Sequence, residues 1–111
     1  MLLRIIHGEL KPGTWGAYEQ AYFEAIHGVE VPGLHGRYLA RDLDNPDAGY
    51  SVSIWEDEAS MRAYESSSLL KDKILPRLTP FFSGQYVTHR SEIRRVEPRN
   101  ACDQSSPETD S

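Results

Sequence analysis

The fold is decided by the stretch YSVSIWEDEASMRAY, which spans residues 50–64. In its first half, apolar and small polar side chains alternate as far as Trp55, which is the period of a β-strand with two different faces. Residues 56–58, Glu-Asp-Glu, then place negative charge where a helix would begin, and this charge matches the helix dipole. Met61 and Tyr64 share one side of that helix. The stretch therefore predicts a strand followed directly by a helix.

The residues before this stretch predict the order strand, helix, strand. Residues 1–10 are rich in Leu and Ile and end at a Lys-Pro-Gly turn, which indicates a strand that is apolar on both faces and central in a sheet. Thr14 is the predicted N-cap of the next helix. The apolar stripe of this helix consists of Trp15, Tyr18, Tyr22, Ala25 and Val29. Residues 34–43 form the next strand, and the turn residues at 44–49 predict a hairpin.

The residues after this stretch complete the expected topology. A further helical piece carries Leu70, Ile74 and Leu78, and Pro76 should bend or restart it. Residues 84–96 are the last expected strand. The order β-α-β-β-α-β predicts an α+β, ferredoxin-like domain, with a four-stranded antiparallel sheet and helices on one face. Because the opposite face would expose apolar side chains, we expect a homodimer that packs sheet to sheet.

Composition excludes several classes of protein. With 39% hydrophobic and 26% charged residues in 111, the chain is typical of one soluble globular domain. No apolar run is long enough to cross a membrane, and the N-terminus does not resemble a signal peptide, so we expect a cytoplasmic protein. The net charge of −5 argues against nucleic acid as a partner.

The last residues differ in composition from the rest. Residues 97–111 contain four acidic residues, one basic residue and two prolines, but no large apolar side chain. Such a segment cannot bury enough surface to offset its ordering entropy, so we predict a disordered acidic tail after a folded domain of residues 1–96. Cys102, the one cysteine, excludes an internal disulfide framework and is expected to be an exposed thiol without a chemical role.

Two motifs resemble the antibiotic biosynthesis monooxygenase domain. They are PGLHGR at residues 32–37 and SIWEDEASMRAY at residues 53–64. In that family a Pro-Gly pair and an apolar residue open the second strand, a Trp-Glu pair ends the third, and an aromatic residue follows on the helix. The resemblance covers about residues 1–96 and implies a ferredoxin-like fold that forms a dimeric α/β barrel. The family includes cofactor-independent oxygenases of anthrone-like polyketides, quinol oxygenases, haem-degrading enzymes and proteins without a known reaction.

The resemblance gives Trp55 two interpretations. In the anthrone-type oxygenases, a Trp at the matching position helps to bind the aromatic substrate and to activate it towards oxygen, and the resemblance implies the same role for Trp55. Alternatively, a Trp at the strand-to-helix corner is a packing anchor. The sequence departs from the anthrone-type pattern, because Ser51 stands where that pattern has an amide and Met61 where it has a Tyr.

His7 is the candidate general base. It shares a strand face with Leu3 and Ile5, and if that face looks towards the helices, His7 points into the cavity between sheet and helices. An imidazole with a pKa of about 6.5 can take a proton from a phenol. Alternatively, His7 is a hydrogen-bonded core residue or lies at the dimer seam. The predicted catalytic residues are therefore His7 and Trp55.

Aromatic residues gather on the expected inner faces of the helices. Each buried phenol needs a partner for its hydroxyl, so several together indicate a cavity with polar groups that suits a flat aromatic ligand. An ordinary core remains the alternative. The predicted substrate-binding residues are Tyr18, Tyr22, Met61 and Tyr64.

No cofactor is expected. The haem-degrading relatives carry a Trp on the second helix and an iron-ligating His after it, where this sequence has Tyr64 and Ile74. The four histidines show no short metal-ligand spacing, and the sequence contains no phosphate loop or dinucleotide fingerprint.

These observations favour a cofactor-independent monooxygenase that acts on a small phenolic substrate, either a quinol or a polyketide-like compound. Two alternatives remain open. One is a non-catalytic dimeric module that binds a small aromatic molecule. The other is an isomerase or cyclase on the same barrel, with His7 or a tyrosine as acid or base.

Overall fold

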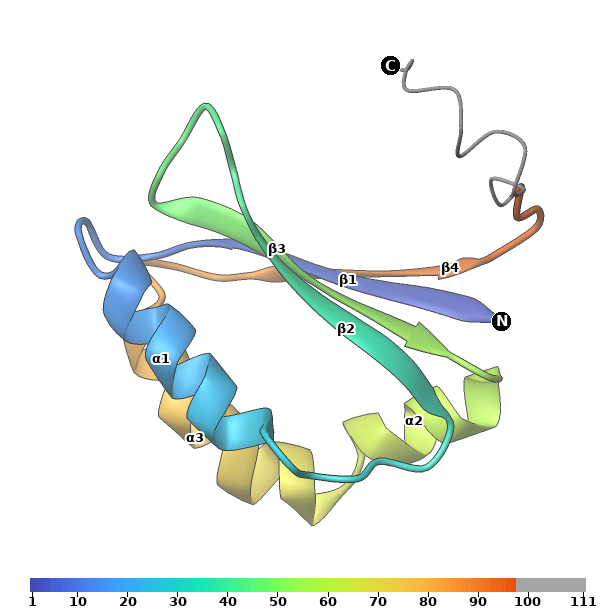
Figure 1. Ribbon diagram of the computed structural model, residues 1–111. Helices are drawn as coiled ribbons and strands as arrows, with labels where there is room; N and C mark the ends of the chain where they lie inside the picture. The colour runs from blue at the N-terminus through green and yellow to red at the C-terminus, as the bar shows by residue number, and fades with distance from the viewer. Residues whose placement is uncertain (98–111) are drawn as a thin grey trace.

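Four strands form one antiparallel sheet, and the helices lie on one of its faces (Figure 1). The computed structural model describes residues 1–97. The strands are β1 (Leu2–Glu9), β2 (Leu34–Arg41), β3 (Ala48–Trp55) and β4 (Val87–Glu92), in the spatial order β2-β3-β1-β4. This arrangement confirms the predicted α+β, ferredoxin-like fold, with the first strand in the interior of the sheet. All but the first residue of the predicted tail, Cys102 included, lie outside the described residues.

The helical layer consists of α1 and a second, interrupted run. Its members are α1 (Trp15–Ile26), α2 (Glu58–Glu65), the π-helical η1 (Leu69–Ile74), α3 (Leu75–Leu78) and the 3-10 helix η2 (Thr79–Phe81). The backbone N–H of Leu75 donates to the carbonyl of Leu70, five residues back. Pro76 follows at the start of α3 and has no N–H to donate, so the regular ladder is interrupted here. Leu70, Ile74 and Leu78 are buried, as predicted.

The helix caps differ from one another. Thr14 precedes α1 as predicted, but its hydroxyl donates to the Lys11 carbonyl at 2.7 Å and caps no helical N–H. Asp57 caps α2, because its carboxylate accepts from the Ser60 N–H at 2.8 Å. This hydrogen bond lowers the pKa of Asp57 below its ordinary value. The acidic start predicted for this helix is therefore confirmed, and the hydrogen bond from Ser60 identifies Asp57 as the residue that caps it.

The last strand is shorter than predicted. It covers Val87–Glu92 instead of residues 84–96. Beyond its end, the N–H of Ile93 still donates to the carbonyl of Met1.

Strand pairing determines which side chains meet the helices. On β1, Leu2 packs against the core, Arg4 reaches Glu65 on α2, and Ile6 lies beside Trp15 and Tyr18. The alternate residues of β1 and their partners on β3 point the other way. We call this side the open face, and it carries Leu3, Ile5 and His7 of β1 opposite Ile54, Val52 and Tyr50 of β3.

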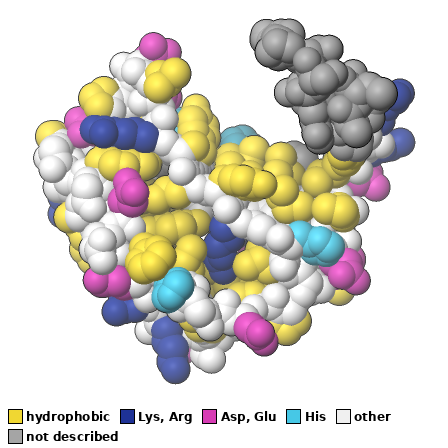
Figure 2. Space-filling view, in the orientation of Figure 1, with side chains coloured by type: hydrophobic (Ala, Val, Ile, Leu, Met, Phe, Trp, Pro, Cys, Tyr) yellow, Lys and Arg dark blue, Asp and Glu magenta, His cyan; other side chains and the backbone are white. Residues whose placement is uncertain are grey.

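The core lies between the sheet and the helices. Its buried members are Leu10, Trp15, Tyr18, Tyr22, Ala25, Trp55, Met61, Tyr64, Leu70, Ile74 and Leu78. Within residues 1–97, none of the helices has the length and apolarity that a bilayer crossing requires. The space-filling view shows a hollow in the side of the molecule between the sheet and the helices, with basic side-chain atoms inside it (Figure 2).

Candidate functional site

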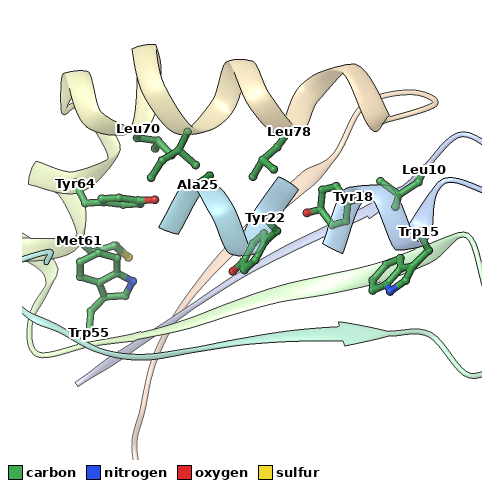
Figure 3. Packing of buried hydrophobic residues seen from close by; sticks show 11 residues of the cluster. Leu10, Trp15, Tyr18, Tyr22, Ala25, Trp55, Met61, Tyr64, Leu70 and Leu78 are labelled. Carbon is green, nitrogen blue, oxygen red and sulfur yellow. The ribbon is translucent and has the colours of Figure 1, made fainter. Parts of the chain in front are cut away.

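Tyr64, Met61 and Trp55 lie one above another at one end of the layer between sheet and helices (Figure 3). The rings of Trp55 and Tyr64 are 5.1 Å apart. Trp55 is fully buried at 0% exposure, and its indole N–H donates to the Ser53 hydroxyl at 2.9 Å. The one polar group of this indole is thus satisfied within its own strand, as a packing anchor requires.

The α1 phenols continue the same layer. The Tyr22 hydroxyl lies 2.8 Å from the Ser51 hydroxyl, and the rings of Tyr18 and Tyr22 are 6.1 Å apart. Burial raises the pKa of Tyr18 far above its ordinary value, and the neighbouring Tyr22 raises it further. Tyr18 therefore stays a neutral phenol at physiological pH. The structure brings Tyr18, Tyr22, Met61, Tyr64 and Trp55 together in one buried layer. The sequence predicts that they line a substrate cavity, and their role in binding or catalysis stays a prediction.

His7 is not part of this layer. Its ring stacks on Tyr50 with centroids 4.7 Å apart, on the open face. The physical reason is the strand alternation, because Arg4 and Ile6 face the helices and His7 therefore faces away. The predicted place of His7 in the cavity is wrong. Of the predicted alternatives, only a position at a dimer seam agrees with this geometry.

A row of arginines crosses the sheet on its helix-facing side, and sequence reasoning missed it. Arg37 pairs with Ser53, Ser53 with Arg4, and Arg4 with Arg90. The Glu65 carboxylate of α2 accepts from Arg4 Nε at 2.6 Å and from Arg90 Nε at 2.8 Å. Burial by itself would raise the pKa of Glu65, but the hydrogen bonds from both arginines outweigh it and lower the pKa. Arg4 could have been recognised from the sequence, because it is a charged residue within an otherwise apolar central strand.

Arg37 has a different environment from the other two. Its Nη1 and Nη2 donate to the Tyr64 hydroxyl oxygen at 3.4 and 3.3 Å, and its guanidinium carbon lies 5.2 Å from the centre of the Tyr64 ring. Among residues 1–97, no carboxylate lies within ion-pair distance of Arg37. The half-buried guanidinium of Arg37 therefore has a neutral phenol as its partner.

A cleft of about 360 Å³ adjoins Tyr64. It lies between α2 and the segment before β2, and its lining is Glu30, Val31, Pro32, Ala59, Ser60, Ala63, Tyr64, Ser67 and Leu69. The segment 29–34 borders a second hollow of about 510 Å³. The lining of the first cleft is mostly apolar with a few hydroxyls, which is the composition that small aromatic ligands require.

The residues do not fit a haem or metal cofactor. Ile74, which stands where the haem-degrading pattern has its iron-ligating His, is 3% exposed in the core, and its side chain has no donor atom. Within the described part of the chain, no three His, Cys, Asp or Glu side chains are grouped as metal ligands would be.

Fold and site together define a ferredoxin-like α+β domain with an aromatic-lined interior. The sequence pattern of one family, antibiotic biosynthesis monooxygenase, matches residues 1–73. This match covers more than half of the chain, and the protein therefore belongs to the antibiotic biosynthesis monooxygenase family.

Solved structures show the same fold. One solved structure of an antibiotic biosynthesis monooxygenase is 16% identical, with a TM-score of 0.71 over 86% of this chain and 100% of that one. The haem degrader MhuD from Mycobacterium tuberculosis, with two haems bound in its active site, is 20% identical, with a TM-score of 0.73 over 88% of this chain and 100% of that one. Among curated proteins, no sequence matches this chain.

Proposed function

We propose that this protein is a cofactor-independent monooxygenase that acts on a small phenolic substrate. The observation that carries the proposal is Tyr64, which belongs to the buried aromatic layer and also lines the apolar cleft. An aromatic ring at such a cleft can stack on a flat ligand, and its phenol hydroxyl can bind an oxygen atom of that ligand. Membership in a family whose description is a monooxygenase supports the reaction class.

Such a reaction needs no external reductant when the substrate supplies the electrons. In an anthrone-like substrate, a CH₂ group between two rings is oxidised to C=O. One oxygen atom of O₂ enters the product and the other leaves as water with the two hydrogens. The task of the protein is then to hold the ring, exclude water and favour the ionised, electron-rich form of the substrate.

The structure supports the holding role more directly than an acid–base role. His7 lies on the open face, and His27, His35 and His89 are exposed. Tyr18 is held neutral by its raised pKa. The described layer thus contains no histidine, and this observation favours the alternative of a binding module without catalysis.

Oxygen uptake separates these functions. The purified protein is mixed with a panel of dihydroxyarenes and anthrones, without added metal or flavin, in an oxygen electrode. We expect uptake with at least one compound, and slower uptake in Tyr64→Phe, which removes a hydroxyl at the cleft, than in Tyr38→Phe, at a residue that is 62% exposed. Binding without uptake would identify a binding module, and conversion without uptake an isomerase or cyclase. The absence of any binding would contradict all three functions.

We also propose that a second copy of the chain covers the open face. Its centre consists of Leu3 and Ile5 beside Val52 and Ile54, and Tyr38 and Val87 remain more than half exposed. A continuous apolar band of this kind is typical of an interface. The protein we propose is thus a homodimer, and we place it in the cytoplasm. The single cysteine of the chain agrees with a reducing compartment.

A further inference from the structure

The guanidinium of Arg37 is the starting point. A charged group withdrawn from water is normally paired with an opposite charge. Arg4 and Arg90 follow this rule, since both donate to Glu65. Arg37 is half-buried, and its contact is the neutral hydroxyl of Tyr64. Within residues 1–97, its charge is thus not balanced by a nearby carboxylate.

The surroundings of Arg37 add to this positive charge. Arg37, Arg4 and Arg90 belong to one row across the sheet, and Glu65 is the carboxylate that contacts the row. Glu65 is also shared with Arg62, at 3.4 Å. This local excess of positive charge occurs in a chain whose net charge is −5. An oxygen anion would therefore be attracted to the helix-facing side of the sheet.

Tyr64 connects Arg37 to a space that a ligand can enter. Tyr64 lines the cleft of about 360 Å³, and its hydroxyl oxygen accepts from Arg37. No residue in the part of the chain that the structure describes accepts the hydrogen of this hydroxyl. Basic atoms are visible inside the hollow between the sheet and the helices (Figure 2). An anionic oxygen beside the Arg37–Tyr64 contact would accept hydrogen bonds from a guanidinium and a phenol together, which is a strong, charge-assisted arrangement.

We propose that Arg37 and Tyr64 form the binding site for an anionic oxygen of the substrate, either a phenolate or a carboxylate on a small aromatic ring. This proposal rests on the proposed function and makes Arg37 a specificity-determining residue. A phenol bound here loses its proton to solvent, because the positive charge stabilises the phenolate. The described residues then need no internal general base, which agrees with the position of His7 on the open face.

Ligand binding tests this site without oxygen. The probes are 4-nitrophenol, whose phenolate has its own absorption band, and benzoate, each compared with a neutral analogue, 4-nitroanisole and benzamide. We expect the wild-type protein to bind the anionic probes more tightly and to lower the pKa of bound 4-nitrophenol. If 4-nitrophenol shows this behaviour and benzoate does not, the oxygen is a phenolate, and the reverse result assigns a carboxylate.

Variants of two arginines on the same strand give the matched comparison. Arg37→Gln should weaken binding of the anionic probe by about tenfold or more, the effect of losing a charge-assisted hydrogen bond, and leave the neutral analogue unchanged. Arg41→Gln removes the same charge from an exposed position and should bind like the wild type. If Arg37→Gln does not fold, Arg37→Lys keeps the charge and should retain the preference for the anion.

Each outcome decides the proposal separately from the monooxygenase function. Equal binding of anionic and neutral probes by the wild type, or no binding of any probe at millimolar concentration, would overturn the site even if oxygen uptake is observed. A preference for the anion that Arg37→Gln abolishes would support the site even if no arene is oxidised. In that case only the proposed monooxygenase reaction would be contradicted, and the binding site would stand.

Discussion

The backbone N–H of Glu56 donates a hydrogen bond to the carbonyl oxygen of Gly33, at 2.8 Å. This bond joins the Pro-Gly motif before β2 to the corner that follows Trp55 at the end of β3. Gly33 has a φ of +80°, and a Cβ at this position would overlap the side chain of Ser60 on α2. The two sequence motifs that indicated the family are therefore one structural unit, and this unit borders the cleft beside Tyr64.

Gly33→Ala should strongly destabilise the protein. The positive φ disfavours any L side chain, and the added methyl group overlaps Ser60. We expect the free energy of unfolding to fall by about 2–4 kcal/mol. Urea denaturation measures the change, with Gly16→Ala as control. Gly16 lies within α1 with open space around it, so that alanine there should stabilise the helix by about 0.5–1 kcal/mol. Equal stability of the two variants would contradict the proposed packing.

Glu65→Gln should lower stability at neutral pH. The variant leaves Arg4, whose side chain is 11% exposed, without its countercharge. We expect a loss of about 2–3 kcal/mol in the free energy of unfolding. Glu58→Gln is the control, because the Glu58–Arg62 pair is exposed and should contribute less than about 1 kcal/mol. A similar small loss in both variants would show that Glu65 is not a structural ion-pair partner.

The Glu65 carboxylate should also make the stability of the fold decrease as the pH falls into the acid range. The pKa of Glu65 is lower in the folded protein than its ordinary value of 4.5. Its ionised form therefore stabilises the fold fully above that value, and the contribution is lost as the pH falls through the folded pKa. Thermal melts from pH 7 to pH 3 should show the wild type and Glu65→Gln converging in stability at the acid end. A constant difference would contradict the lowered pKa.

Val52→Asp should convert a dimer into a monomer. Val52 lies opposite Ile5 at the centre of the open face, where a carboxylate would be desolvated by a second copy. Light scattering at micromolar concentration should give about twice the chain mass for the wild type and the single chain mass for the variant. Phe23→Asp, at a 53% exposed position on α1, is the control and should stay dimeric. A monomeric wild type would remove the barrel arrangement.

His7→Ala should leave turnover within about twofold of the wild type, because a positioned general base would be worth about 10²–10⁴-fold. His7 stacks on Tyr50 outside the aromatic layer. The rate of oxygen uptake with the best arene of the panel measures the effect, and light scattering controls for a change in association. If the rate of oxygen uptake fell a hundredfold or more while the dimer stayed intact, His7 would have to take part in the reaction through a contact across the dimer interface.

Removal of residues 98–111 should leave the melting temperature within about 1 °C of the full chain, because the predicted tail carries no large apolar side chain to bury. A fall of several degrees on a thermal melt would show that these residues dock on the domain and that its boundary lies beyond residue 97.

Much of the fold could be predicted because it depends on local signals. The alternation before Trp55, the acidic cap at Asp57 and the breaker Pro76 each act within a few residues of themselves. The aromatic members of the layer could be predicted as well, since the spacing of Tyr18 and Tyr22 fixes their common helix face. The arginine row was missed because Arg4 and Arg37 stand 33 positions apart and meet only through their shared partner Ser53.

The sequence by itself determined the order of elements, the family and the two faces of each strand. Only the tertiary structure decided which face of β1 the helices cover, and thus why Arg4 is inside the layer while His7 is on the open face. Period-two alternation separates two sets of side chains but carries no information on which set is buried when both contain apolar residues. The contacts of Arg4 with Glu65 and of Arg37 with Tyr64 join residues 61 and 27 positions apart, and such pairs form only when the sheet and helices pack together.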